Sequence, residues 1–122
     1  MGPLRRLPGR RAEIYGGHVA TTYHLVPRRI WDASGELSTP EGFIHCTDGA
    51  DEVAATANRY FAQEQDELLA LVIDLERVTA PVRYEDPRRV YPHIYGPIPR
   101  EAIVQVLAMP RDAAGRFLPP QS

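Results

Sequence analysis

Histidines are the residues of this chain best suited to acid/base chemistry near neutral pH. Three of the four lie in strand-like or proline-rich runs, and these are His24, His45 and His93. The fourth, His18, follows two glycines and is expected to lie in an exposed loop. No pair has the i, i+4 spacing of a helical metal motif, so a three-histidine metal site is only an alternative. We expect no bound metal.

The run Gly-Phe-Ile-His-Cys-Thr at 42–47 has the composition of a β-strand. Because side chains alternate along a strand, His45 and Thr47 share one face and Cys46 points to the other. Activation of the thiol by the adjacent histidine is therefore not expected. Cys46 is expected to pack as a small buried apolar group.

His93 lies in Tyr-Pro-His-Ile-Tyr-Gly-Pro at 91–97, where prolines and a glycine restrict the backbone. We expect residues 86–98 to form a structured loop that displays His93 and Tyr95 to a ligand. The alternative is that this loop plugs the core with its aromatic side chains.

Two further candidates depend on the elements around them. His24 lies in the expected strand 19–26, on the opposite face from its neighbours. Arg59 lies on the polar side of an expected helix at 51–63, in which Val53, Ala57, Tyr60 and Phe61 form an apolar stripe at helical spacing. An anion clamp and a solvated side chain both remain open for Arg59.

The expected elements mix strands with two helices and lack regular βαβ alternation, which favours the α+β class. The run at 68–75 is almost wholly apolar, as expected of a central strand buried on both faces. The other expected elements are strands at 19–26, 43–47, 82–85 and 103–109, helices at 27–33 and 51–63, and a single turn at 99–102.

The length of 122 residues fits one domain, expected at 14–109. Four arginines against Glu13 give residues 1–13 a net charge of +3, in a chain of formal net charge −2. We expect this segment to be a flexible basic leader and residues 110–122 to be a loose tail. Since the body of the chain is acidic, nucleic acid is not expected as the main partner.

Composition excludes several classes of protein. All 14 basic residues are arginine, which rules out a Schiff-base lysine, a pyridoxal phosphate enzyme and a P-loop. The single Cys46 cannot form an internal disulfide. No apolar run is long enough to span a membrane, and no secretory signal is present. We expect a cytoplasmic protein whose oligomeric state the sequence leaves open.

The two histidine motifs at 42–47 and 91–97 resemble those of the DUF952 family. Weaker points of resemblance, spread over about residues 22–107, are Tyr23-His24-Leu25, Ala57-Asn58-Arg59-Tyr60-Phe61, Leu71-Val72-Ile73-Asp74 and Val82-Arg83-Tyr84-Glu85. Relatives usually have Trp where Tyr84 stands, and a longer segment between Trp31 and Gly42.

The resemblance implies a fold like that of ADP-ribosyltransferases, with a small mixed or antiparallel β-sheet split around a cleft that holds NAD in active relatives. It also implies that His24 is the first site residue and that His45 and Thr47 are the second. His93 and Tyr95 would then line the far wall. Glu85 and Glu101 are the candidates for an acidic residue.

Three hypotheses about function follow from these residues. The first is an NAD- or nucleotide-dependent enzyme, like an ADP-ribosyltransferase or an NAD glycohydrolase, with His24, His45 and His93 in catalysis. Thr47, Arg59, Tyr95 and Glu85 would bind the ligand. The second is a module that binds a small nucleotide or anion without turnover. The third is a structural or interaction protein.

Overall fold

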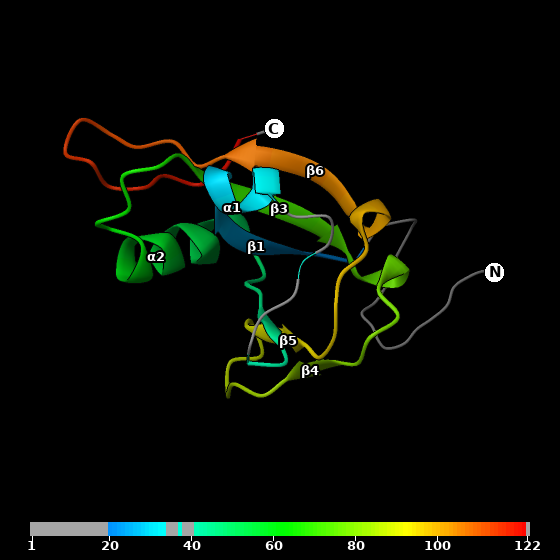
Figure 1. Ribbon diagram of the computed structural model, residues 1–122. Coiled ribbons are helices and arrows are strands. Elements are labelled where there is room, and N and C mark those ends of the chain that lie inside the picture. The colour runs from blue at the N-terminus through cyan, green and yellow to red at the C-terminus, as the bar shows by residue number, and fades with distance from the viewer. Residues whose placement is uncertain (1–19, 34–36, 38–40, 122) are drawn as a thin grey trace.

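The computed structural model describes residues 20–33, 37 and 41–121. The chain is an α+β protein in which two three-stranded antiparallel sheets lie one above the other (Figure 1). The first sheet has the order β1-β3-β6 and consists of Thr21–Pro27, Leu68–Asp74 and Ile103–Ala108. The second has the order β2-β5-β4 and consists of Ile44–His45, Pro92–Ile94 and Val82–Tyr84.

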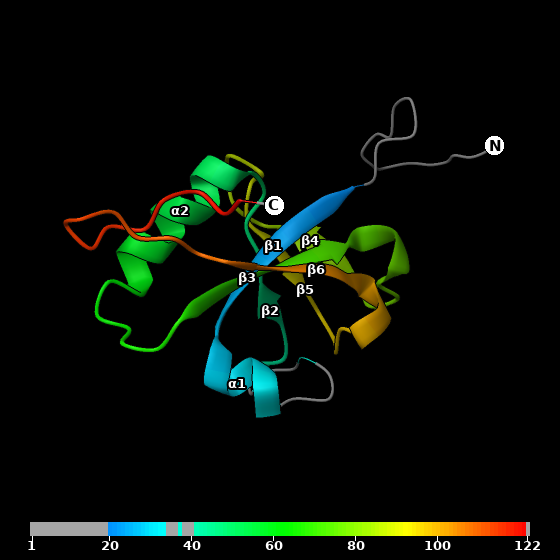
Figure 2. The ribbon, with the colours of Figure 1, turned by 90° about the horizontal axis from the view of Figure 1, so that it is seen from above.

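Two α-helices pack against opposite sides of the first sheet (Figure 2). They are α1, Arg28–Ala33, and α2, Ala50–Tyr60. Two 3₁₀ turns, η1 at Leu75–Arg77 and η2 at Arg100–Ala102, flank the ends of β3 and β6. Among the described residues, no helix is long and apolar enough to cross a membrane.

Strand β3 is the centre of the fold, and all seven of its residues are buried. Its side chains alternate between two cores, as the pleat of a strand requires. Leu69, Leu71 and Ile73 face the second sheet, whereas Leu68 and Ala70 face α2. The prediction of a central strand buried on both faces is therefore confirmed.

Helix α2 lies where the sequence predicts a helix but ends at Tyr60, before the predicted residue 63. Phe61 leaves the helical conformation at φ −123°, and its N–H closes the last turn on the carbonyl of Ala57. Val53 and Ala57 are fully buried, as the apolar stripe predicts. Tyr60 is not part of this stripe, because its side chain is 70% exposed.

The prediction that residues 86–98 form only a loop is wrong. Pro92–Ile94 form β5, the central strand of the second sheet, which pairs with β2 on one side and β4 on the other. The prolines conceal this strand in the sequence, since proline usually stands at strand edges or starts. Pro92 is the first residue of the strand, so its missing N–H costs no bond within it.

Gly96 follows β5 and is required by a close approach of two backbones. Its φ is 155°, and a Cβ built at this position would lie 2.8 Å from the Cβ of Ala80. The glycine of the second histidine motif therefore lets the chain leave β5 directly against the segment before β4.

The segment expected to be a loose tail packs against the domain at Phe117. This ring is 4% exposed and belongs to the core under α2. The Asn58 side chain holds the backbone on both sides, accepting from the Phe117 N–H at 2.7 Å and donating to its carbonyl at 3.0 Å. The expected leader 1–13 and His18 lie outside the described residues.

Candidate functional site

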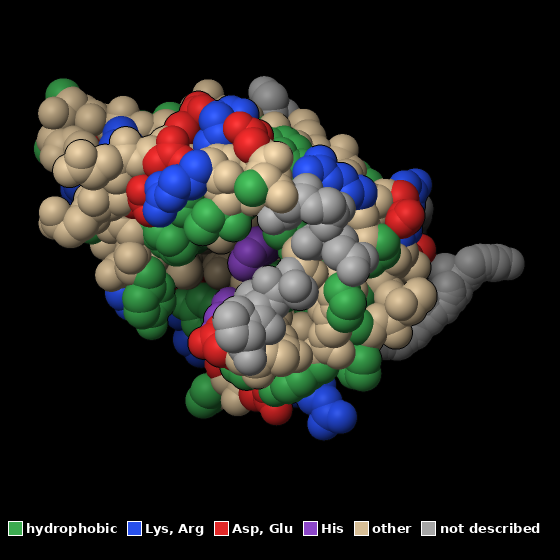
Figure 3. Space-filling model, in the orientation of Figure 1, with side chains coloured by type: hydrophobic (Ala, Val, Ile, Leu, Met, Phe, Trp, Pro, Cys, Tyr) green, Lys and Arg blue, Asp and Glu red, His purple; other side chains and the backbone are tan. Residues whose placement is uncertain are grey.

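A cavity of about 640 Å³ opens between α2, β1 and the second sheet. Histidine side chains are visible in a hollow in the middle of the face shown in Figure 3. His24 comes to this cavity from β1, His45 from β2, His93 from β5, and Arg59 from α2. The volume is within the range of small-molecule sites, roughly 300–1,000 Å³.

His45 and His93 form a cross-strand pair. They stand directly opposite each other in the β2–β5 register, which puts both side chains on one face of the second sheet. Their ring centroids are 4.9 Å apart, and the Phe43 ring lies 4.8 Å from His45 and 4.6 Å from His93. The Phe43 ring therefore packs against both imidazoles, and both histidines line the cavity.

His24 approaches this pair from the first sheet. Its strand meets the chain just after β2 through two backbone bonds between Tyr23 and Thr47, at 2.9 and 2.8 Å. The His24 Nδ1 lies 2.7 Å from the carbonyl oxygen of His45. A carbonyl only accepts hydrogen bonds, so Nδ1 carries the proton and Nε2 of the neutral ring is an acceptor. Desolvation by burial lowers the pKa of His24 and favours this neutral form.

His93 is oriented from behind by Glu85. The His93 Nδ1–H donates to the Glu85 carboxylate at 3.0 Å, and the Tyr95 hydroxyl donates to the same oxygen. These bonds, that of Tyr95 before that of His93, lower the pKa of Glu85, which keeps it an anion. With Nδ1 fixed as the donor, the Nε2 of the neutral ring is left as an acceptor.

The α2 wall of the cavity carries a positive charge at Arg59. Interaction with the hydroxyls of Tyr91 and Tyr60 raises the pKa of its guanidinium. Glu52, whose charge also acts on Arg59, is already bonded by Arg88 at 2.8 Å and by the Tyr91 hydroxyl at 2.9 Å. Within the described part of the chain, no salt bridge joins Arg59 to a carboxylate.

Cys46 takes no part in this chemistry. Its side chain is 3% exposed and packs in the core between the two sheets. Burial raises the pKa of the thiol far above its ordinary value, which leaves it protonated and unreactive. His45 is exposed, so the prediction that strand alternation separates these two neighbours is confirmed.

Asp48 is a partly buried carboxyl that stands beside the site without lining it. The Tyr84 hydroxyl donates to its Oδ2 at 2.6 Å, and the Asp48 N–H donates to the carbonyl of Val90. Burial raises the pKa of Asp48, although the bond from Tyr84 opposes this shift. The hydroxyl of Tyr84 thus ties β4 to the start of α2.

The structure brings five of the seven predicted site residues to one cavity: His24, His45, Thr47, Arg59 and His93. It does not bring Glu85 or Tyr95 there. Glu85 accepts from His93, which lines the cavity, and Tyr95 donates to Glu85. Because β4 and β5 are antiparallel, Glu85 follows the end at which Tyr84 pairs with Pro92, and Tyr95 follows the opposite end. The Tyr95 hydroxyl reaches back along the sheet to the Glu85 carboxylate.

Sequence reasoning did not propose the other eight lining residues as site residues: Leu25, Glu41, Cys46, Thr56, Tyr60, Phe61, Asp86 and Tyr91. Glu41 lies 3.7 Å from the Nε2 of His45, and both side chains are 60% exposed. The position of Glu41, three residues before β2, could have indicated this proximity, because a loop residue can fold over the end of the strand that follows it. The end of α2 at Tyr60 could not be predicted, because the helical spacing of apolar residues continues through Phe61.

Metal binding has no geometric basis among the described residues. Within residues 20–33, 37 and 41–121, no group of three His, Cys, Asp or Glu side chains is placed to hold an ion. His24 and His93 each use Nδ1 for a bond to protein, to a carbonyl and to a carboxylate respectively.

Comparison with sequence families gives one match, over residues 24–106, to a family described as a protein of unknown function, DUF952. The chain belongs to the DUF952 family. The match covers both histidine motifs and every strand except the start of β1 and the end of β6. A search of curated proteins gives no match.

Among solved structures, the chain is similar to protein CC0527 from Caulobacter crescentus. The crystal structure of that protein has a TM-score of 0.67 and 23% identity, with 84% of this chain and 94% of that chain covered. Its solution NMR structure has a TM-score of 0.63 and 24% identity, with 78% and 89% covered. At this identity the similarity shows the shared fold.

Proposed function

We propose that this DUF952 protein binds NAD or a related nucleotide in the histidine cavity and cleaves the bond between the ribose and nicotinamide. The observation that carries this proposal is the convergence of His24, His45 and His93 with Arg59 on one cavity of about 640 Å³. The family resemblance implies an ADP-ribosyltransferase-like fold, in which a cleft holds NAD in active relatives. Fold alone assigns no activity, so the proposal rests on the side chains.

The proposed reaction needs a group that attacks the ribose and a group that takes its proton. Water or an acceptor hydroxyl forms a bond to C1′ of the ribose while the C1′–N bond breaks. Nicotinamide leaves as a neutral molecule with the bonding electron pair, and the attacking group releases one proton. The Nε2 of His93 is the proposed acceptor of this proton, since Glu85 holds the opposite nitrogen protonated.

Other cavity residues have distinct proposed roles. The Nε2 of His24 accepts a hydrogen bond from a ribose hydroxyl, which suits a neutral ring whose Nδ1–H is held by a carbonyl. Arg59 binds the pyrophosphate through its guanidinium, whose charge no carboxylate among the described residues pairs in a salt bridge. Glu41, close to His45 at the rim, supplies negative charge near a ribose that becomes positive as the bond breaks.

Release of nicotinamide from NAD by the purified protein tests the proposal, with the product separated by chromatography. His93→Gln is expected to lower the rate about 100-fold or more, because general acid–base groups contribute about 10²- to 10⁴-fold. Arg59→Gln is expected to raise KM. Arg116→Gln is a matched control, since Arg116 is exposed and lies far along the chain in the C-terminal segment. The proposal is refuted if the protein neither releases nicotinamide nor binds NAD at millimolar concentration.

A non-catalytic binding module is the second candidate, and one observation favours it. Glu85, the acidic residue that the sequence offers near the site, is bonded to His93 and Tyr95 and does not line the cavity. A nucleotide that raises the melting temperature and is recovered unchanged would support binding alone. A purely structural role for His45 is disfavoured because its side chain is 60% exposed.

A further inference from the structure

Tyr60 is an exposed aromatic residue at the mouth of the cavity. It is the last residue of α2 and lines the cavity, yet its side chain is 70% exposed, the highest value among the exposed large hydrophobic residues. An aromatic side chain at the rim of a concave site, with most of its surface in water, is typical of a position that a ligand covers.

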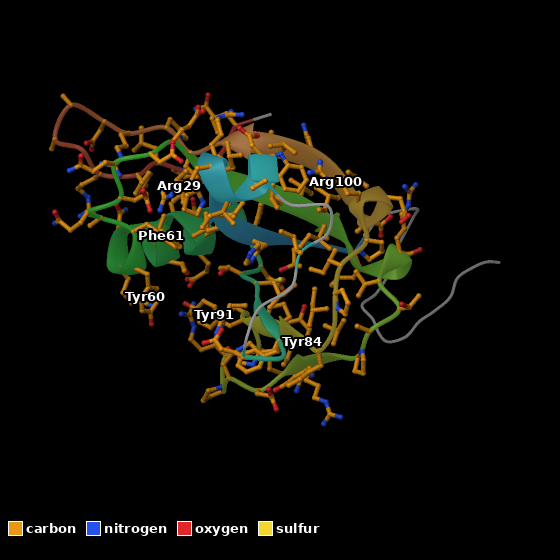
Figure 4. The ribbon with its side chains drawn as sticks, in the orientation of Figure 1. Arg29, Tyr60, Phe61, Tyr84, Tyr91 and Arg100 are labelled. Carbon is orange, nitrogen blue, oxygen red and sulfur yellow. The ribbon has the colours of Figure 1, made fainter. Side chains whose placement is uncertain are left out.

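The surroundings of Tyr60 favour a ligand that is both planar and anionic. The Arg59 guanidinium lies 5.8 Å from the Tyr60 ring centroid and also interacts with the hydroxyl of Tyr91. Tyr60 projects from α2 toward the level of Tyr91 (Figure 4), and Arg59, Tyr60 and Tyr91 all line the cavity. The three histidines line the same cavity from the strands β1, β2 and β5.

We infer that Tyr60 and Arg59 form a subsite for a nucleoside 5′-phosphate, in which the base stacks on the Tyr60 ring and the phosphate binds the Arg59 guanidinium. This inference deepens the proposed function and rests on it in one respect. The group at this subsite would be the non-reacting nucleotide half of the substrate, which leaves the reacting ribose for the histidines.

The chemistry of stacking predicts the selectivity of the subsite. Every nucleobase has a planar face, so stacking on tyrosine increases the affinity for any nucleotide. It adds nothing to the affinity for a sugar phosphate that lacks a base. A phosphate contact, in contrast, contributes equally to both ligands. Tyr60 should therefore contribute to the affinity for AMP but not for ribose 5-phosphate, whereas Arg59 should contribute to both.

Isothermal titration of AMP and ribose 5-phosphate into the full-length protein tests this inference. Tyr60→Ala is expected to weaken AMP binding about 10- to 100-fold and to change ribose 5-phosphate binding less than about 2-fold. Tyr60→Phe keeps the ring and is expected to bind AMP as the unchanged protein does. Arg59→Gln is expected to weaken both ligands, and Arg116→Gln neither.

Several results would overturn the subsite. One is no binding of AMP at millimolar concentration, and another is an equal loss for the two ligands in Tyr60→Ala. The outcome is separable from that of the proposed function. If AMP follows the expected pattern but NAD is not cleaved, the subsite stands and the enzymatic proposal fails. If NAD is cleaved and Tyr60→Ala leaves KM unchanged, the subsite fails and the activity stands.

Discussion

Replacement of Phe117 by Ala measures how far the C-terminal segment belongs to the domain. The ring is 4% exposed and packs with Val53 and Ala57 of α2, and the Arg111 guanidinium lies 4.0 Å from its centroid. Removing a buried phenylalanine ring costs about 3–5 kcal/mol. Residues 110–121 form no helix or strand beyond one isolated bridge, so this segment can partly collapse into the space, and we expect a loss near 3 kcal/mol.

Urea denaturation followed by far-UV circular dichroism measures this loss as a change in the free energy of unfolding. The melting temperature is expected to fall by about 10 °C in a domain of this size. Asn58→Ala removes both bonds to the Phe117 backbone and is expected to cost about 1–2 kcal/mol. Leu118→Ala is the control, because that side chain is 40% exposed and should change stability by less than about 0.5 kcal/mol.

The reasoning is refuted if Phe117→Ala costs less than about 1 kcal/mol, a value typical of surface positions. It is equally refuted if deletion of residues 110–122 leaves the free energy of unfolding unchanged. Either result would show that the segment is the loose tail that its proline-rich composition predicts.

Three further predictions concern backbone fit, pH and the orientation of the site. Gly96→Ala should destabilise the protein by about 1–3 kcal/mol, and Ala80→Gly in the same chain should restore part of this loss, because the two Cβ atoms would lie 2.8 Å apart. Since burial raises the folded-state pKa of Asp48, its contribution to stability is present at low pH and is lost as pH rises through that pKa. The stability of Asp48→Asn relative to the unchanged protein should therefore increase from pH 4 to pH 7 in denaturation experiments, and a constant difference would contradict the shift. Ring ¹⁵N shifts should show His93 protonated at Nδ1, a mixture of tautomers in Glu85→Ala and the original tautomer in Glu85→Gln; an unchanged tautomer in Glu85→Ala would exclude Glu85 as the positioning residue.

Local features of the fold could be predicted because they depend on residues close in sequence. The apolar run of β3, the helical period of α2 and the alternation of His45 with Cys46 can each be recognised from a few neighbouring residues. Each of these features is a property of one element, and all three are present in the structure.

Features that depend on distant pairing could not be predicted in this way. β5 exists because β2 and β4 bond to it from both sides, and nothing in its own proline-rich run indicates those partners. Phe117 is buried because Asn58, in a helix far along the chain, holds its backbone. Tyr60 belongs to an apolar stripe by period alone, and only the end of α2 at the cavity mouth exposes it.

The sequence by itself determined the family, the separation of His45 from Cys46 and the exclusion of every lysine-dependent chemistry. Only the tertiary structure decided that His24, His45 and His93 meet at one cavity and that Glu85 stands behind His93 instead of facing a ligand. The physical reason is that residue type and alternation are encoded along a single strand. Convergence, in contrast, depends on pairing between segments far apart in the chain: backbone bonds between Tyr23 and Thr47 join β1 to the segment after β2, and β2 pairs with β5.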